Sequence, residues 1–129
     1  MGRQIKFRAW VKRVGGHEFG RMAKVIGMYG NYNSAHVRGI DCAIDDLVSV
    51  DDIELMQFTG LEDIDKIEIY EGDIVSVYSA YDEHRFKGVV GFSDASFMIK
   101  NDACTYYRWM DYEVEVLGNI YENSELLEG

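Results

Sequence analysis

Two alternating apolar runs joined by a polar segment constrain the fold of this chain more than any other feature. The first run covers residues 53–59, and the second is the β-branched run of residues 74–77. Such alternation is typical of β-strands with one covered face. Gly60 and Gly72 bracket the polar segment, so the stretch predicts strand, turn, strand. We expect the neighbouring strands to pack on this unit.

Further apolar runs predict more strands, and they cover residues 5–9, 22–29, 74–81, 86–92, 95–100 and 113–116. The chain has no proline, so Gly, Asn, Asp and Ser must make its turns. Gly15 and Gly16 predict a hairpin after the first run. Residues 31–39 show no period and predict an exposed loop, whereas residues 40–52 fit a short helix and a short strand equally.

The close spacing of these runs predicts a mainly β protein, with small rolled sheets or an SH3-like barrel in the C-terminal half. The pair GDIV at residues 72–75 and GVVGF at residues 88–92 resembles the first hairpin of SH3-like barrels. In such barrels the Gly-Asp turn reverses the chain and the valines fill the interior. The tail of residues 123–128 begins with N-cap residues and predicts one short helical turn.

Several blocks of the chain resemble the signature of a known family. They are MQFTGL at residues 56–61, EIYEGDIV at 68–75 and LGNIYENSELL at 117–127, and the opening IKFRAW at 5–10 is similar to that family's start. These blocks resemble the YopX family of phage and prophage proteins. Matches at both ends and in the middle make the resemblance cover nearly the whole chain. The resemblance implies no activity, because the family has none established.

A single YopX-like domain over residues 1–129 is therefore expected, which also fits the length of one ordinary domain. Within it we distinguish an N-terminal β part, residues 1–52, from a barrel-like part, residues 53–129. The chain departs from the family pattern at Asp65-Lys66, where an Asn-Gly turn is common, and at Ser124, where Pro is common. Since lysine has a steric cost at positive φ, we expect a longer or type I turn at residues 65–66.

The composition predicts a globular protein, because 47% of the residues are hydrophobic and 13% aromatic. No apolar run approaches the roughly 20 residues of a membrane-spanning helix, and the basic N-terminus lacks the apolar core of a signal peptide. We expect a cytoplasmic protein in a bacterial host cell, without membrane association. In that reducing compartment Cys42 and Cys104 should be free, buried thiols.

Charge is divided unevenly along the chain. Residues 1–38 hold eight Lys or Arg against the single acid Glu18, a net charge of +7, and the remainder holds five bases and 22 acids, a net charge of −17. Such an imbalance produces a dipolar field. We favour a basic segment that lies across acidic surface of its own chain or of a neighbouring copy. The other reading is a nucleic-acid contact through Arg8, Lys12 and Arg13.

The sequence carries none of the motifs of common catalytic or cofactor sites. It has no Gly-rich phosphate loop, no G-x-S-x-G, no H-E-x-x-H and no C-x-x-C. His17-Glu18 and Asp82-Glu83-His84 place carboxylates beside imidazoles, but adjacent strand residues point to opposite faces. The acids of residues 45–54 lack the spacing of an EF-hand. We therefore predict no catalytic residue, no metal, no cofactor and no enzymatic activity.

Aromatic residues gather in the C-terminal half. The run Tyr106-Tyr107-Arg108-Trp109-Met110 is too continuous for one buried face. Exposed Tyr, Trp, Arg and Met are enriched at interface cores. We predict that Tyr106, Tyr107, Arg108 and Trp109 contribute to an interaction surface.

These observations lead to a hypothesis of a non-enzymatic phage or prophage accessory protein that acts by macromolecular binding and self-association. It would be a homo-oligomer with a host or phage protein as a further partner. The alternative is a nucleic-acid-directed role, in which either the basic N-terminal arm contacts phosphates or the acidic remainder imitates them and blocks a host protein. Because the net charge is −10, we expect weak or no binding of naked duplex DNA at physiological salt.

Overall fold

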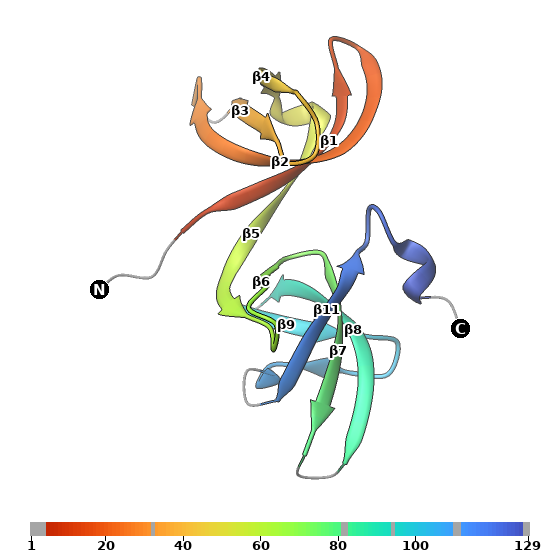
Figure 1. Cartoon of the computed structure of the whole chain (residues 1–129). Helices are drawn as coiled ribbons and strands as arrows, with labels where there is room; N and C mark the ends of the chain where they lie inside the picture. The colour runs from red at the N-terminus through yellow and green to blue at the C-terminus, as the bar shows by residue number, and fades with distance from the viewer. Residues whose placement is uncertain (1–4, 32, 81–82, 94, 110–111, 128–129) are drawn as a thin grey trace. The chain divides into compact units, whose positions relative to one another are not determined.

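The structure, a computed structural model, describes residues 5–31, 33–80, 83–93, 95–109 and 112–127. These residues form two compact units, the N-terminal unit through Gln57 and the C-terminal unit from Phe58 onward. Each unit is built on an antiparallel sheet, and the helical elements of the described chain are short 3-10 turns (Figure 1). The prediction of a mainly β protein is confirmed.

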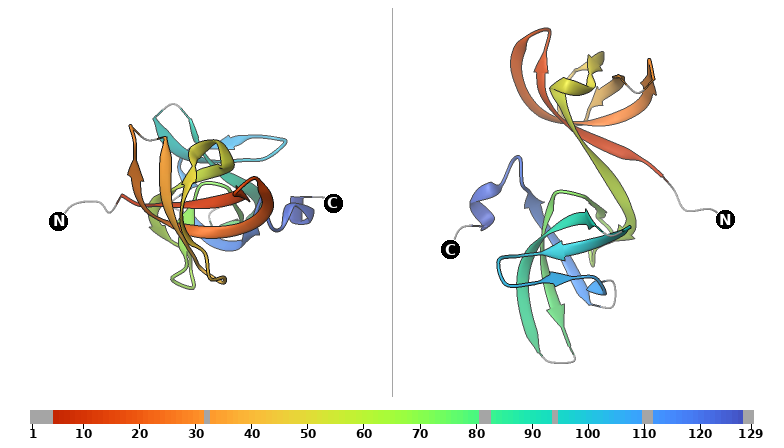
Figure 2. Two further views of the ribbon diagram at one scale, coloured as in Figure 1. Left: turned by 90° about the horizontal axis from the view of Figure 1, so that it is seen from above. Right: turned by 180° about the vertical axis from the view of Figure 1, so that it is seen from behind.

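In the N-terminal unit β1 to β4 form an antiparallel meander, and β5 crosses back to pair with β1, which gives the strand order β4-β3-β2-β1-β5. Its strands are β1 (Phe7–Val14), β2 (His17–Tyr29), β3 (Ser34–Gly39), β4 (Asp45–Ser49) and β5 (Ile53–Glu62), which continues into the C-terminal unit. Gly15 and Gly16 make the β1–β2 turn at φ 58° and 81°, so the predicted hairpin is confirmed. Figure 2 shows that this red-to-orange hairpin is strongly curved.

Small buried side chains form the core of this unit: Ala9, Val11, Ala23, Ala35, Val37, Val48 and Ile53. The prediction of an exposed loop at residues 31–39 is wrong, and two of these core residues show why. Ala35 and Val37 are fully buried and place residues 34–39 in β3, paired with β2 and β4. Residues 40–52, left open between helix and strand, contain both β4 and the 3-10 turn η1 (Val50–Asp52).

The C-terminal unit has a sheet with the order β10-β9-β8-β7-β11. Its strands are β7 (Asp73–Ser79), β8 (His84–Ser93), β9 (Ser96–Lys100), β10 (Thr105–Tyr106) and β11 (Glu113–Asn119), and the short β6 (Glu68–Tyr70) pairs with β5. Among the described strands no pairing of β10 with β11 closes this sheet. The sheet is therefore open, and the barrel alternative is not confirmed. The predicted helical turn is present as η3 (Ser124–Leu127).

Both faces of β7 are covered, because the consecutive residues Asp73 to Val77 are all buried. Since one face of each alternating run needs a core, the sequence predicts that Ile74, Val75, Val77, Val90, Val114 and Val116 are buried, and the first five are. The sixth, Val116, is half-buried and packs against the same cluster. The strand expected to end at Tyr81 ends at Ser79, and Tyr81 lies outside the described residues.

The central stretch forms β5, β6 and β7 in succession, with positive φ at both bracketing glycines. Gly60 has φ 90° and Gly72 has φ 84°. The backbone of Gly72 joins three parts of the unit, because its N–H donates to the carbonyl of Val90 at 2.8 Å and its carbonyl accepts from Ile120 at 2.9 Å. Glycine adopts this positive φ without a steric clash, so the chain can turn into β7 while its backbone bonds both β8 and the segment after β11.

The turn between β5 and β6 has three residues between Asp63 and Ile67. The N–H of Asp63 donates to the carbonyl of Ile67 at 2.8 Å, and the N–H of Lys66 donates to the carbonyl of Asp63 at 3.0 Å. The loop is longer than a two-residue Asn-Gly turn, as expected. Lys66 nevertheless takes the left-handed conformation, with φ 68°.

Neither cysteine lies in a core. Cys42 and Cys104 are both free, as expected, but Cys42 is half-buried and Cys104 is exposed, so the prediction of buried thiols is wrong. In the part of the chain that the structure describes, no helix has the length and apolar character needed to cross a membrane.

Candidate functional site

Lys12 and Arg13 of β1 lie beside acids of their own unit. Nζ of Lys12 is 3.1 Å from Oε1 of Glu54, and Nε of Arg13 is 2.9 Å from Oδ1 of Asp52. Nη2 of Arg13 also donates to the carbonyl of Asp51 at 3.2 Å. These contacts favour the reading in which the basic segment faces acidic residues of the same chain.

Other basic side chains of the N-terminal unit lie within its sheet. Arg8 is half-buried in β1 and stands directly opposite Met56 of β5. Nε of Arg38 is 3.5 Å from Asp45, and Nε2 of His36 is 2.5 Å from the same carboxylate. The hydrogen bond with His36 and the charge of Arg38 lower the pKa of Asp45 below its ordinary value, against a smaller opposing effect of desolvation.

The charge boundary of the sequence does not coincide with the boundary of the folded units. Residues 4–57 contain seven Lys or Arg and seven Asp or Glu, so their net charge is zero. Residues 58–129 contain five bases and 16 acids, a net charge of −11. Six of the seven acids that balance the basic residues lie in residues 41–54, and the seventh is Glu18. Folding therefore leaves a neutral N-terminal unit and an acidic C-terminal unit.

The aromatic run divides between core and surface. Trp109 is 1% exposed, and its indole N–H donates to the carbonyl of Phe97 at 3.1 Å, so this residue belongs to the core and not to an exposed surface. Tyr106 is half-buried and stacks on Phe86 with ring centroids 4.1 Å apart. Tyr107 and Arg108 are exposed. The expected contact surface thus retains two of its four members, and Met110 lies outside the described residues.

The two predicted sets of interaction residues belong to different units. Arg8, Lys12 and Arg13 lie on β1 of the N-terminal unit, and residues 106–109 lie on and after β10 of the C-terminal unit. Neither unit alone carries both sets.

A hollow of about 220 Å³ lies over Trp109 on the C-terminal unit, and we call it the Trp109 hollow. Its lining includes the buried Ile69, Trp109 and Val114 and the exposed Leu61, Ile64 and Tyr112, with Glu62 and Glu113 beside them. Ile64 is 58% exposed, beside the exposed Leu61 and Tyr112 of the same lining. The hollow combines a buried aromatic floor with exposed apolar walls.

Asp63 holds the loop that carries Ile64. Its carboxylate accepts backbone N–H groups from Asp65 at 2.8 Å, from Ile67 at 3.0 Å and from Val116 at 2.9 Å. Burial by itself would raise the pKa of Asp63, but the three N–H donors outweigh it and lower the pKa below its ordinary value. Ile64 adds a bond from its own N–H to the carbonyl of Val114 at 3.0 Å. The exposed Ile64 is therefore held in place against β11.

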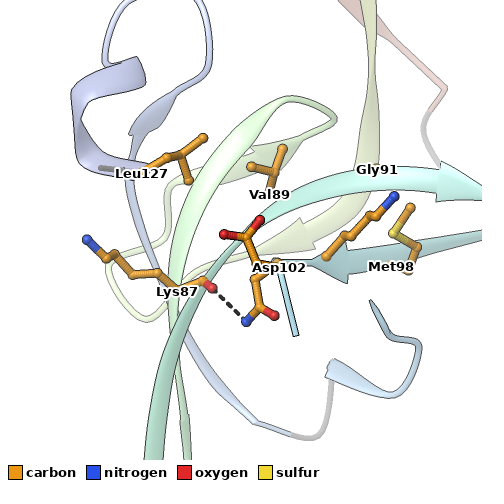
Figure 3. Close-up of a pocket in the computed structure, with 8 residues that line it drawn as sticks. Lys87, Val89, Gly91, Met98, Asp102 and Leu127 are labelled. Carbon is orange, nitrogen blue, oxygen red and sulfur yellow. Dashed lines mark hydrogen bonds between the residues drawn. The ribbon is translucent and has the colours of Figure 1, made fainter. Parts of the chain in front are cut away.

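A second and larger pocket, of about 370 Å³, lies on the face of β8 and β9 opposite the core, and we call it the β8–β9 pocket. Its lining is Lys87, Val89, Gly91, Met98, Lys100, Asn101, Asp102 and Leu127. Figure 3 shows Leu127 of the tail and Met98 of β9 on opposite sides of Val89. The pocket therefore has an apolar floor between two strands and a wall supplied by η3.

Hydrogen bonds fix the polar side of this pocket. Nζ of Lys87 donates to the carbonyl of Leu126 at 2.6 Å, which ties the tail to β8. Nδ2 of Asn101 donates to the carbonyl of Lys87 at 3.1 Å (Figure 3), and its Oδ1 accepts from the backbone N–H groups of Ala103 and Cys104. The loop after β9 is thus anchored to β8 through Asn101.

The sequence contained only a weak signal for the β8–β9 pocket. The alternation of Lys87, Val89 and Gly91 places them on one face, but it does not reveal that Leu127 covers that face. Within the described ranges no group of three or more His, Cys, Asp or Glu side chains is arranged to hold a metal ion. Asp82, one of the carboxylates that stand near His84 in the sequence, lies outside the residues that the structure describes.

The blocks that carry the family resemblance shape turns and strand ends. Oγ1 of Thr59 donates to the carbonyl of Ile69 at 2.8 Å, and Oδ2 of Asp73 accepts from the N–H of Tyr70 at 2.8 Å. Oδ1 of the buried Asn119 accepts from the two N–H groups that follow at residues 121 and 122, at 3.0 and 2.9 Å. These polar groups make hydrogen bonds that fix turns and strand ends, so the blocks that carry the family resemblance have a structural role in this fold.

Comparisons with known proteins agree with this description. The model of the family described as YopX protein matches residues 6–128. The crystal structure of protein EF1440 from Enterococcus faecalis is similar over 98% of this chain and 100% of its own, with a TM-score of 0.64 and 26% identity. The crystal structure of YopX from Bacillus subtilis has the same fold over 96% of both chains, with a TM-score of 0.59 and 24% identity. No curated protein matches the chain significantly. Since the family model spans nearly its full length, this chain belongs to the YopX family.

Proposed function

We propose that this protein is a non-enzymatic phage or prophage accessory protein that binds a macromolecular partner through the Trp109 hollow of its C-terminal unit. The observation that carries the proposal is the exposure of Ile64, at 58%, on a loop that is held rigid by the buried Asp63. A preformed apolar projection costs little conformational entropy on binding. Exposed apolar groups around a buried floor are typical of protein contact sites.

The charge of the C-terminal unit indicates what kind of partner fits. Residues 58–129 have a net charge of −11, and Glu62 and Glu113 stand beside the hollow. An apolar protein surface with basic residues around it would complement both features. A second copy of the same hollow would be repelled by its like charge, so self-association has to use another surface. The proposed partner is thus a basic protein of the host or the phage.

A matched pair of variants tests this contact. Ile64→Asp puts a charge into the hollow, and Leu47→Asp makes the same change at a residue of the N-terminal unit that is equally exposed, at 59%. Both variants should fold, as judged by circular dichroism. In capture experiments with infected host cells, the wild type and Leu47→Asp should retain the same protein and Ile64→Asp should lose it. Capture by all three proteins alike would show that the hollow is not the contact.

The second candidate function is imitation of nucleic acid by the acidic C-terminal unit. It is supported by the net charge of −11 over residues 58–129, while the neutral N-terminal unit and the pairing of Lys12 and Arg13 speak against a basic arm. A mimic should occupy the nucleic-acid site of its partner. Excess duplex DNA should then elute the captured partner. If high salt elutes the partner but duplex DNA does not, the protein binds through the hollow and does not imitate nucleic acid.

The basic-arm form of this alternative has its own test. Labelled duplex DNA should show no mobility shift with the protein at physiological salt, because the molecule as a whole repels phosphates. A tight complex with steep salt dependence that is lost in Lys12→Glu and Arg13→Glu would instead establish the arm.

A further inference from the structure

We infer that the β8–β9 pocket binds a small monoanion that has an apolar body, a ligand class distinct from the protein partner proposed for the Trp109 hollow. The pocket measures about 370 Å³, within the range of roughly 300–1,000 Å³ found for small-molecule sites. Its floor and its charged rim are each defined by strand register.

Register explains the apolar floor. Val90 and Ile99 pair with each other and point into the core, where they are 1% and 0% exposed. Their neighbours Val89 and Met98 therefore lie on the opposite face of the sheet. Gly91 stands directly across from Met98, and a Cβ added there would be 2.9 Å from Cε of Met98. The missing side chain at Gly91 is thus what keeps the floor open.

Two ammonium groups give the rim its positive character. The backbone of Lys100 pairs with Val89 across the strands, and its ammonium group makes no hydrogen bond or ion pair within the part of the chain that the structure describes. Lys87 uses one N–H to hold the carbonyl of Leu126 at 2.6 Å and keeps two for a ligand. Asp102 is the single acid in the lining. A monoanion matches the resulting charge of +1, and a dianion would face the Asp102 carboxylate.

This concentration of positive charge is unusual for its surroundings. Only five Lys or Arg occur in residues 58–129, against 16 acids, and two of the five line this pocket. The Leu127 wall and the Val89 and Met98 floor would cover the apolar body while the anion stays at the mouth with Lys100. Carboxylates of medium chain length have this chemistry.

The methyl group of Met98 provides a local reporter. Octanoate should shift the Met98 signal in spectra of protein labelled at the methionine methyl carbons, while the signals of Met22, Met28 and Met56 stay in place. Octanol, which lacks the charge, and acetate, which lacks the chain, should each bind more weakly than octanoate. The absence of any Met98 shift with octanoate at millimolar concentration would overturn the inference.

Charge variants separate a specific site from a general apolar hollow. Lys100→Gln should weaken octanoate binding about fivefold, the size expected for a solvent-accessible ion pair, and leave octanol binding unchanged. Asp102→Asn should strengthen octanoate binding, and Lys66→Gln, which removes a charge outside the pocket, should have no effect. Gly91→Ala should weaken both ligands because it fills the floor. Equal binding of octanoate and octanol, unaffected by Lys100→Gln, would refute the anion site.

Discussion

The carboxylate of Asp63 accepts the backbone N–H of Val116 at 2.9 Å, although the two residues are 53 positions apart in the chain. The same carboxylate holds the N–H groups of Asp65 and Ile67 within its own loop. Asp63 is 7% exposed, so these bonds replace the water that it loses. One side chain thereby attaches the β5–β6 loop to the edge of β11.

Asp63→Ala should destabilise the C-terminal unit by about 2–4 kcal/mol, because it leaves buried N–H groups without their acceptor. Urea unfolding monitored by tryptophan fluorescence, with Trp10 replaced by Phe so that Trp109 is the remaining fluorophore, would measure the loss. Asp65→Asn, a change at an exposed carboxylate of the same loop, should alter the free energy of unfolding by less than about 0.5 kcal/mol. Equal stability of Asp63→Ala and the wild type would show that these bonds are not made in solution.

The stability that Asp63 contributes should depend on pH. Its pKa in the folded protein lies below the ordinary value of 3.8, so its contribution is complete above that value and is lost as the pH falls through the folded pKa. The difference in unfolding free energy between the wild type and Asp63→Asn should therefore be constant near neutral pH. It should shrink in acid, as the pH falls below 3.8 and through the lower pKa of Asp63 in the folded protein. A difference that grows with acidity would reverse the sign assigned to this group.

Lys66→Gly should stabilise the C-terminal unit by about 0.5–1 kcal/mol, since Lys66 has φ 68° and glycine adopts this conformation without a Cβ clash. Thermal unfolding would report the gain as a higher midpoint temperature. Lys66→Ala removes the same charge and retains the clash, so it serves as the control and should show little gain. If both variants gain equally, the cause is charge and not backbone conformation.

Val77→Asp should unfold the C-terminal unit. Val77 is fully buried, and an unpaired carboxylate in the core costs several kcal/mol against a total stability of about 5–15 kcal/mol. Loss of dispersed amide signals in NMR spectra would show the unfolding, while the wild type should give the circular dichroism spectrum of a β protein. Val77→Ile is the matched control and should remain folded.

Self-association remains a prediction. A contact between the basic residues of β1 and acidic residues of another copy is no longer the mechanism that we expect for it. Lys12 and Arg13 already contact Glu54 and Asp52 of their own chain, so reversing these two charges should leave any oligomer in place. Light scattering at low and high salt measures the mass. A single-chain mass at every concentration would contradict the homo-oligomer. Dissociation of an oligomer by Lys12→Glu would show that β1 does take part in the contact between copies.

Local patterns in the sequence were sufficient for the longer strands and for buried residues of β7, β8 and β11. Alternation places Val75 and Val77 on one face of β7, because side-chain direction in a strand depends only on position parity. It does not predict that Ile74, on the other face, is buried too. The same reasoning failed at residues 34–39, where the apolar positions Ala35 and Val37 are too few and too small to stand out. Helical or strand character of such a short run depends on the neighbours that it pairs with.

The mainly β character, the special roles of Gly60 and Gly72 and the family could all be predicted from the sequence, since each depends on residues that are close along the chain. The burial of Trp109, the contact of Lys12 with Glu54 and the pocket that Leu127 forms with Met98 became visible only in the folded chain. These facts depend on strand order and on contacts between distant segments. The physical reason is that a side chain's solvent exposure and its charge partner are properties of the packed sheet, which local periodicity does not encode.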